Sequence, residues 1–277
     1  MSCVVIHPNP DLDACTCVAL DGADAEHVHF IPADYLHIPR ECPCCGEQYL
    51  AQEKDLRILD HPIGQKGRLD ADGTRHAAAC SMPEAASADP KLLAEVDEKD
   101  STGIVRQPRF GLDAVLSAIR TEASERGLRQ AALDREVVAV MSRIIRGINL
   151  LWAAHKEAKT VIAVSRIETI GGFRIAVLPK AEISPEVGIV LNDEHDVSGA
   201  IYAQGFNLGV TRYPGRERPD LRKLEQFLSG WFVHTAGFLA CWGSRKAPAT
   251  KPPPAGTPQT QDELLALMRK VFGSANR

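Results

Sequence analysis

The sequence lacks three features that would assign it to a class at once. It contains no stretch approaching the roughly 20 apolar residues of a membrane-spanning helix, so we expect no membrane association. The N-terminal residues contain neither a basic leader nor a long apolar core, which predicts a cytoplasmic protein without an export signal. Basic residues are not in excess: the sequence has 32 Lys and Arg and 36 Asp and Glu, which gives a net charge of -4. This balance excludes a protein that binds nucleic acid through positive charge alone, but not an enzyme that holds phosphate through metal ions.

The sequence also lacks a full set of cysteine metal ligands, a Ser-His-Asp triad and a glycine-rich phosphate-binding loop. No Ser-His-Asp set is recognisable, and the glycines lack the spacing of a phosphate-binding loop. A chain of 277 residues does not need its eight cysteines as disulfides, so we expect a reducing compartment. Cys42 and Cys45 predict a zinc site, because two thiolates at Cys-x-x-Cys spacing can bind one tetrahedral ion. The alternative is a loop with half-buried thiols, unless a further ligand completes the site: His27, His29, His37 or Cys80.

The apolar residues are patterned as in an α/β protein. Short β-branched runs indicate strands in the first part of the chain, at 3–7, 27–33 and 56–60. Helical periodicity then follows at 89–100, 110–127 and 133–158. Five more short apolar runs indicate strands, at 160–165, 173–179, 187–192, 199–205 and 208–214. A capped helix is predicted at 219–230.

This order of elements predicts two domains. We expect a parallel-sheet, metal-binding N-terminal domain, a long linking helix, and a smaller mixed α+β domain that binds substrate. The proline-rich stretch near the C-terminus predicts a linker before a last amphipathic helix. The corresponding segments are 1–130, 131–159, 160–245 and 246–277.

A histidine and two aspartates follow the first predicted strand. His7, Asp11 and Asp13 lie in the stretch His-Pro-Asn-Pro-Asp-Leu-Asp, and Asp60 ends another strand. Ligand sites of open α/β sheets lie at the carboxyl ends of strands, so these side chains can share one site. Mixed nitrogen and carboxylate ligation suits Mn²⁺ or Mg²⁺. The alternatives are an aspartate that only caps the following helix and a turn-forming aspartate at position 60.

The stretch 7–14 resembles the first motif of the DHH phosphoesterase superfamily, which includes RecJ-type exonucleases, oligoribonucleases and family II inorganic pyrophosphatases. Three later stretches resemble later motifs in the family's order. Residues 56–78 are similar to the second and third motifs, and 92–104 to the fourth, especially in the Myg subfamily. Residues 231–240 resemble the glycine-containing substrate motif. The resemblance implies metal-dependent hydrolysis of a phosphodiester or phosphoanhydride, in a nucleotide or short oligonucleotide, at a cleft between domains.

The resemblance also implies roles for individual residues. His7 and Asp11 would hold one Mn²⁺ or Mg²⁺ ion. Asp13 would hold a second ion, and Asp60 would bridge both. Asp13, Asp60 and His76 would form the catalytic centre. The implied metal ligands are His7, Asp11, Asp13, Asp60 and His76, and Asp97 or Asp100 would complete the second metal site.

The sequence departs from the family at the third motif, where Asp-His-His is missing. We assign Asp60 to the second motif and Arg75-His76 to a remnant of the third, in which Arg75 can bind phosphate as a bidentate fork. The candidate phosphate contacts are Lys66, Arg75, His234 and Gly237. The departure leaves a second hypothesis open: a catalytically reduced relative that binds metal or nucleotide as a regulatory module. A homodimer is compatible with either hypothesis.

Overall fold

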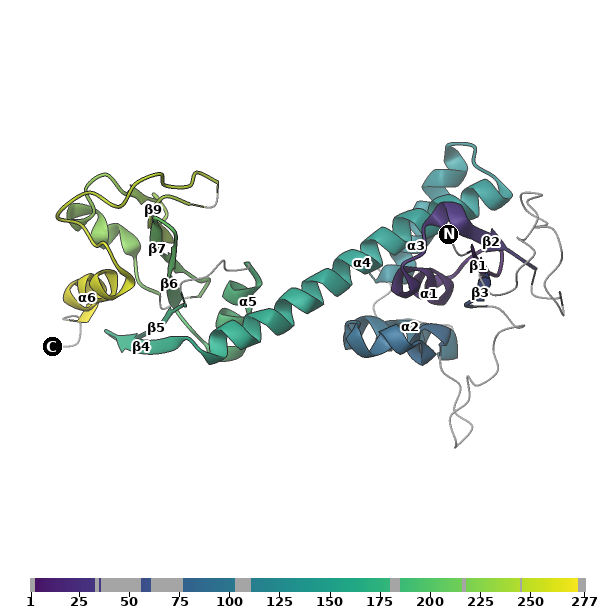
Figure 1. Ribbon diagram of the computed structural model, residues 1–277, viewed down its shortest axis with the longest axis horizontal. Coiled ribbons are helices and arrows are strands. Elements are labelled where there is room, and N and C mark those ends of the chain that lie inside the picture. Colours follow the sequence, from purple (N-terminus) through teal and green to yellow (C-terminus); the bar gives the residue numbers. More distant parts are fainter. Residues whose placement is uncertain are drawn as a thin grey trace, which may run out of the picture. The chain divides into compact units, whose positions relative to one another are not determined.

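The contacts of the chain, seen in a computed structural model, form two compact units (Figure 1). The structure describes residues 3–32, 35, 56–60, 77–102, 111–179, 185–215, 218–244 and 246–273. The first unit is Met1–Trp152 and the second is Ala153–Arg277. The division falls within one long helix, α4 (Gln130–Ala163), so each unit is described by itself. The four predicted sequence segments and the proposed two-domain arrangement stay predictions.

A parallel sheet of three strands lies at the centre of the first unit. Its strands are β1 (Cys3–Ile6), β2 (Val28–Phe30) and β3 (Leu56–Ile58), in the order β2-β1-β3. The central strand β1 has three fully buried residues, as expected of a strand covered on both faces. The predicted parallel sheet is confirmed for these described strands. Parallel pairing places the carboxyl ends of β1 and β3 at the same edge.

Helix α1 (Leu12–Asp21) follows β1 and forms the middle of the first core. Asp11 caps its N-terminus, because the carboxylate accepts a hydrogen bond from the Ala14 amide at 3.0 Å. Gly22 ends it at a φ of 80°, a left-handed conformation that costs glycine little. Every residue from Leu12 to Ala19 is buried, so other elements cover α1 on all sides.

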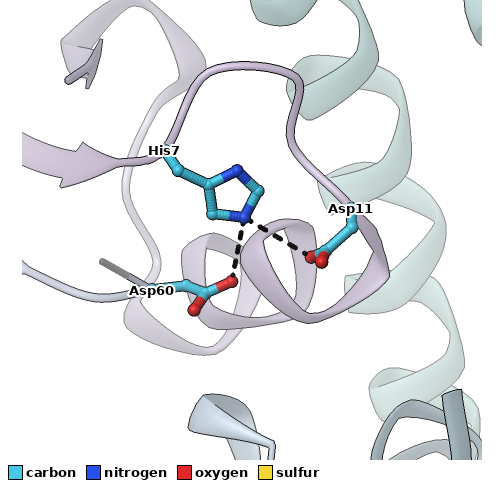
Figure 2. A group of neighbouring side chains, drawn as sticks. All are labelled: His7, Asp11 and Asp60. Atoms are coloured by element: carbon cyan, nitrogen blue, oxygen red, sulfur yellow. Dashed lines mark hydrogen bonds and ion pairs between the residues drawn. The ribbon is translucent and has the colours of Figure 1, made fainter. Parts of the chain in front are cut away.

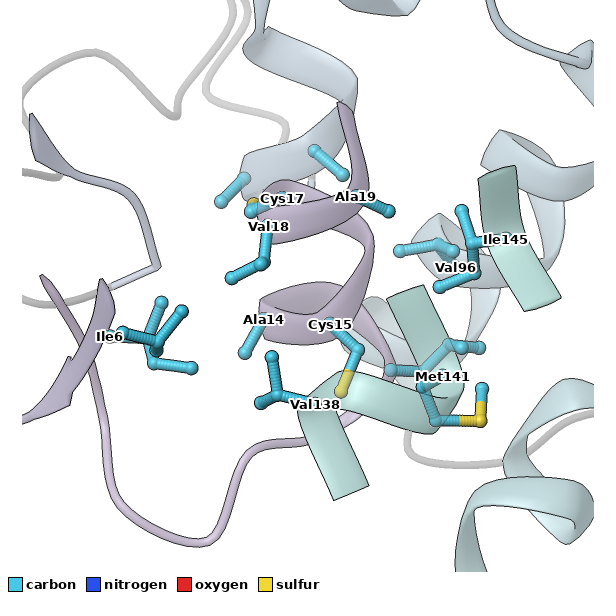
Figure 3. Packing of buried hydrophobic residues seen from close by; sticks show 14 of the residues in the cluster. Ile6, Ala14, Cys15, Cys17, Val18, Ala19, Val96, Val138, Met141 and Ile145 are labelled. Atoms are coloured by element: carbon cyan, nitrogen blue, oxygen red, sulfur yellow. The ribbon is translucent and has the colours of Figure 1, made fainter. Parts of the chain in front are cut away.

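Helices from later in the chain provide that cover. They are α2 (Pro90–Thr102), α3 (Leu112–Glu125) and the first part of α4, preceded by the 3₁₀ turns η3 (Ala78–Ser81) and η4 (Pro83–Ser87). Figure 3 shows Val96 of α2 and two residues of α4, Val138 and Met141, next to the apolar side chains of α1. Residues far apart in sequence therefore hold the segment that follows β1.

The second unit contains a mixed sheet of six strands. The strands, in chain order, are β4 (Arg166–Ile170), β5 (Phe173–Val177), β6 (Gly199–Gln204), β7 (Asn207–Arg212), β8 (Phe232–Val233) and β9 (Leu239–Trp242). Their order in the sheet is β4-β5-β6-β7-β9-β8. The β5–β6 pair is parallel and the other pairs are antiparallel.

Helices pack against both faces of this mixed sheet. Helix α6 (Gln261–Phe272) and the 3₁₀ helix η5 (Leu221–Phe227) share one apolar cluster with the sheet. Helix α5 (Pro185–His195) and the end of α4 share the other cluster. The described part of the chain is therefore mixed α/β, with one parallel and one mixed sheet.

Three predicted elements differ from the structure. The run 160–165, predicted as a strand, begins with the last turn of α4 and continues into an irregular segment. The run 187–192, also predicted as a strand, lies within α5. A short apolar run cannot be told from a buried helix by periodicity, and here Val187, Val190 and Leu191 all face the sheet core at helical spacing. The helix predicted at 219–230 is the shorter 3₁₀ helix η5.

Within the described residues, α4 meets the length and composition that a membrane-crossing helix would need. One such helix is weak evidence for a membrane span, because core helices of soluble proteins pass the same test, although only 28% of the tested window of α4 is buried. We therefore attach no membrane assignment to it. The expected lack of membrane association stays a prediction.

Candidate metal centre

Three side chains converge at the carboxyl edge of the parallel sheet. His7 follows β1, Asp11 caps α1 and Asp60 follows β3 (Figure 2). One ligand atom from each lies within 4.8 Å of the other two. His7 Nε2 is 3.2 Å from an oxygen of Asp60 and 3.8 Å from an oxygen of Asp11. The two strand ends and the helix start thus bring one nitrogen and two carboxylates together.

Backbone bonds keep the two strand ends in register beside each other. The Leu59 amide donates to the Val5 carbonyl at 3.0 Å, and the His7 amide donates to the Asp60 carbonyl at 3.2 Å. These bonds continue the β1–β3 ladder past the last strand residue. The side chains of His7 and Asp60 are therefore placed by sheet geometry.

The imidazole of His7 is also oriented by its own loop. Its Nδ1 donates a hydrogen bond to the Pro8 carbonyl at 2.8 Å. Histidines that ligate metal ions usually donate their second ring nitrogen in this way, which fixes the tautomer and the ring direction. Nε2 is then the nitrogen available as a ligand, and it is the atom that faces Asp11 and Asp60.

The two carboxylates change the protonation of the histidine. Burial disfavours the imidazolium, but hydrogen bonds to Asp11 and Asp60 outweigh it and raise the pKa of His7 to about 10. Burial would also raise the pKa of Asp11, but the hydrogen bonds from His7 and the Ala14 amide lower it below its ordinary value. An imidazolium between two carboxylates therefore occupies the place that suits a metal cation.

The donor set fits a divalent ion. Metal–ligand distances of about 2.0–2.6 Å place two ligands of one ion within about 5 Å of each other, as these three atoms are. Asp60 is 4% exposed, whereas half of the Asp11 side-chain surface (51%) is open to solvent. The group is therefore closed on the Asp60 side and accessible on the Asp11 side.

Asp13, predicted as the ligand of a second ion, has another set of partners. Its side chain is buried, and its two oxygens accept hydrogen bonds from the amides of Ala78 and Ala79 at 2.7 and 2.8 Å. These bonds tie η3 to the first turn of α1. Asp13 is not one of the three residues in the group described above, and its role as a metal ligand stays a prediction.

The remaining predicted ligands of the first unit lie on α2 or outside the described residues. Asp97 accepts a hydrogen bond from the Ala77 amide at 2.9 Å. One carboxylate oxygen of Asp100 is buried with no hydrogen-bond partner in the described part of the chain. Neither residue belongs to the group of His7, Asp11 and Asp60. The predicted residues that fall outside the described ranges are Cys42, Cys45, Lys66, Arg75 and His76.

The two predicted phosphate contacts of the second unit lie in the turn between β8 and β9. The Ala236 amide donates to His234 Nδ1 at 3.1 Å, and the His234 ring contacts the Phe238 ring at a tilt of 39°, with centroids 4.0 Å apart. Gly237 has a φ of 66°, and a Cβ there would lie 2.2 Å from an oxygen of Asp220. This tight turn requires glycine, and it belongs to a different unit from the candidate metal ligands.

Sequence reasoning missed two residues that hold the loop between His7 and Asp11. Asp134 of α4, only 7% exposed, accepts a hydrogen bond from the Asn9 amide at 3.0 Å. Arg120 of α3 donates to the Pro10 carbonyl at 2.6 Å and also to the Asn9 side chain. Asn9 itself has a φ of 60°, which asparagine tolerates better than most residues. No sequence signal marks either charge, since single charges are frequent on helices.

Comparisons with known proteins give distant structural similarities only. No family model and no curated protein match the chain. The solved structures that are similar include the pGpG-specific phosphodiesterase PggH from Vibrio cholerae, at 12% identity and a TM-score of 0.31, covering 87% of this chain and 92% of that one. Exonuclease RecJ bound to manganese shows 14% identity and a TM-score of 0.28, with 100% and 90% covered. RecJ in complex with Mg²⁺ from Thermus thermophilus shows 16% identity and a TM-score of 0.31, with 99% and 49% covered. Similarity at this level assigns no family.

Proposed function

We propose that this chain is a metal-dependent phosphoesterase that hydrolyses a phosphodiester or phosphoanhydride in a nucleotide or short oligonucleotide. The observation that carries the proposal is the convergence of His7, Asp11 and Asp60 at the carboxyl edge of the sheet. The resemblance of the stretch 7–14 to the first DHH motif supports the same function. Mn²⁺ or Mg²⁺ is the expected ion, because the donors are one imidazole and two carboxylates.

The three residues differ in solvent exposure, and each would have a different role in binding the ion. A bound divalent ion supplies Lewis acidity to a phosphoryl oxygen and lowers the pKa of a bound water. Asp60 is shielded from solvent and would contribute a fixed negative charge on the inner side. Asp11 lies at the open side, where a substrate phosphate would approach. His7 contributes Nε2 as a neutral ligand once its proton has left.

The rest of the proposed centre rests on the order of the motifs in the sequence. We assign a second ion to Asp13 together with residues of the later motifs: His76, Asp97 and Asp100. Substrate phosphate would be bound by Lys66, Arg75, His234 and Gly237. Their approach to the metal ligands is a consequence of the proposal and is the part that mutagenesis has to test.

A second candidate function is a regulatory module that binds metal or nucleotide without turnover. Two observations favour it. The sequence lacks Asp-His-His, and both oxygens of Asp13 are already bound by backbone amides. In that case the group of His7, Asp11 and Asp60 would bind one ion and hydrolysis would be absent.

Hydrolysis and metal binding have to be measured together to separate these functions. We would assay bis-p-nitrophenyl phosphate and short oligonucleotides with Mn²⁺ or Mg²⁺, and measure binding of the same ions by calorimetry. Asp60→Asn keeps the shape of the side chain but removes the charge, so we expect turnover to fall by about 100-fold or more. The matched control is Asp24→Asn, a change at an exposed aspartate of the same unit, which should leave turnover unchanged.

Each result points to one function. Metal-dependent turnover that Asp60→Asn removes supports the phosphoesterase. Metal binding without turnover of any of these substrates supports the regulatory module and rejects hydrolysis of phosphodiesters by this chain. No binding of either ion to the wild-type protein would reject the phosphoesterase and a metal-binding regulatory module.

A further inference from the structure

The second unit contains a groove that has no part in the proposed metal site. It has a volume of about 840 Å³ and lies between the β8–β9 pair and the following segment, residues 243, 244 and 246–251, which we name the strap. Its lining residues outside the strap are Gly230, Phe232, Leu239, Cys241 and Trp242. The volume is in the usual range for small-molecule sites.

Strand register explains why the sheet face is open here. Phe232 pairs with Cys241, so their side chains share one face, and Leu239 shares it two residues away. On the same face, Cys241 pairs with Gly209 of β7, where a Cβ would lie only 2.4 Å from the Tyr202 hydroxyl. Phe232 is 56% exposed, so its ring is open to solvent beside the groove. The Tyr202 side chain fills the space above Gly209, so the open part of this face lies beside Phe232 and Leu239.

The strap is tied to the sheet at several points, so the groove is formed before any ligand binds. Trp242 Nε1 donates to the Lys251 carbonyl at 2.9 Å. The Ala249 amide donates to the side-chain oxygen of Asn207 at 2.8 Å. The Ala247 amide donates to the Ser244 hydroxyl at 3.1 Å, which closes a turn within the strap. A pre-formed groove spares a ligand part of the entropy cost of ordering.

The chemistry of the lining indicates the kind of ligand. Lys246 and Lys251 supply two positive charges, and the lining contains no acidic residue among those that the structure describes. Phe232 and Trp242 supply aromatic surface, on which a planar ring can stack. We propose that the groove binds a small anion that carries an aromatic ring, of the class of a nucleoside monophosphate. The strap lysines contact the anionic group and Phe232 contacts the ring.

Three probes separate the contact with the anionic group from the contact with the aromatic ring. Binding of adenosine 5′-monophosphate, adenosine and inorganic phosphate to the full chain would be followed by calorimetry in the presence of EDTA. We expect the nucleotide to bind more tightly than adenosine or phosphate alone, because only it uses both the lysines and the aromatic surface. Higher salt should weaken nucleotide binding, since salt screens the attraction between exposed charges.

Variants locate the binding in the groove. Lys251→Ala should lower the affinity for the nucleotide by up to about fivefold, as expected for an exposed charge contact. Phe232→Ala should lower the affinity for the nucleotide by about tenfold, the usual effect of losing a stacking partner. Lys223→Ala changes an exposed lysine outside the groove and is the matched control. Thermal unfolding would show that each variant is folded.

The test also separates this site from the proposed metal centre. The double variant His7→Ala and Asp11→Ala should bind the nucleotide as the wild type does, whether or not the protein is a phosphoesterase. The proposal is overturned by no nucleotide binding, by equal binding of phosphate alone, or by nucleotide affinity that Lys251→Ala and Phe232→Ala leave unchanged. It is also overturned if the double variant in the metal centre removes the binding.

Discussion

At the scale of single residues, the proton on His7 decides whether the group at the sheet edge can take a metal ion. His7 Nε2 faces Asp60 at 3.2 Å and Asp11 at 3.8 Å, and these carboxylates raise its pKa to about 10. An imidazolium has no lone pair on Nε2 and cannot be a ligand. Metal binding therefore has to displace a proton, and the two cations compete for the same place.

This competition predicts a pH dependence of metal affinity. Below pH 10 His7 carries a proton, so binding of Mn²⁺ or Mg²⁺ should release about one proton, and affinity should rise as the pH is raised toward 10. Calorimetry at pH 8 in two buffers of different ionisation enthalpy measures the released proton. The variant His7→Gln, which cannot hold the proton, should bind more weakly and release none. Binding by the wild type with no proton release would contradict the prediction.

Arg120 and Asp134 are positioning residues for the loop between the candidate ligands His7 and Asp11. Asp134→Ala removes the described acceptor of the Asn9 amide, and a hydrogen bond to a charged group contributes about 1.5–3 kcal/mol. We expect the loop to lose its conformation and Mn²⁺ affinity to fall by about tenfold. Asp134→Asn retains an oxygen acceptor and should stay close to the wild type. An equal loss of Mn²⁺ affinity in both variants, measured by calorimetry, would show that the charge of Asp134 matters and its hydrogen bond does not.

At the scale of elements, α1 is the part on which the candidate centre depends. Its N-cap is the candidate ligand Asp11, and its first turn carries Asp13, which binds the start of η3. The helix is buried on all sides, so its position is set by packing against later helices. Any change that moves α1 therefore moves one of the three candidate ligands.

Asp13 should consequently be important for stability as well as for any second ion. Asp13→Ala removes the acceptor of two buried amides, so we expect the free energy of unfolding to fall by about 2–4 kcal/mol. Asp13→Asn keeps one oxygen acceptor and should lose less. Urea denaturation without added metal measures both effects. If Asp13→Ala unfolds at the wild-type urea concentration, the link between α1 and η3 contributes nothing.

The elements also show where sequence patterns succeed and where they fail. The strand ends carrying His7 and Asp60 were predictable, because β-branched runs end there. The runs 160–165 and 187–192 were predicted as strands, and the prediction was wrong because an apolar run of six residues suits a buried helix equally well. Helix α5 forms because Val187, Val190 and Leu191 can all pack on the sheet.

At the scale of the whole molecule, the two units should respond differently to metal. Ligand binding stabilises the folded state by about 2.7 kcal/mol when the ligand is at 100 times its Kd. The candidate ligands belong to Met1–Trp152, so Mn²⁺ should increase hydrogen-exchange protection in β1, α1 and β3. Protection in β6 and β7 of the second unit should not change. The double variant His7→Ala and Asp11→Ala is the control. Equal protection of both units by Mn²⁺ would contradict a site confined to the first.

The sequence by itself determined the residue types and their local setting: one strand followed by a histidine, another followed by an aspartate, and an aspartate placed to cap the helix after the first strand. These follow from short-range patterns of hydrophobicity and backbone preference. Only the tertiary structure decided which atoms meet. Asp13 binds the amide of Ala78, 65 residues away, and Asp134 holds Asn9 from 125 residues away. Such pairs depend on how helices close over the sheet, and no local pattern records that closure.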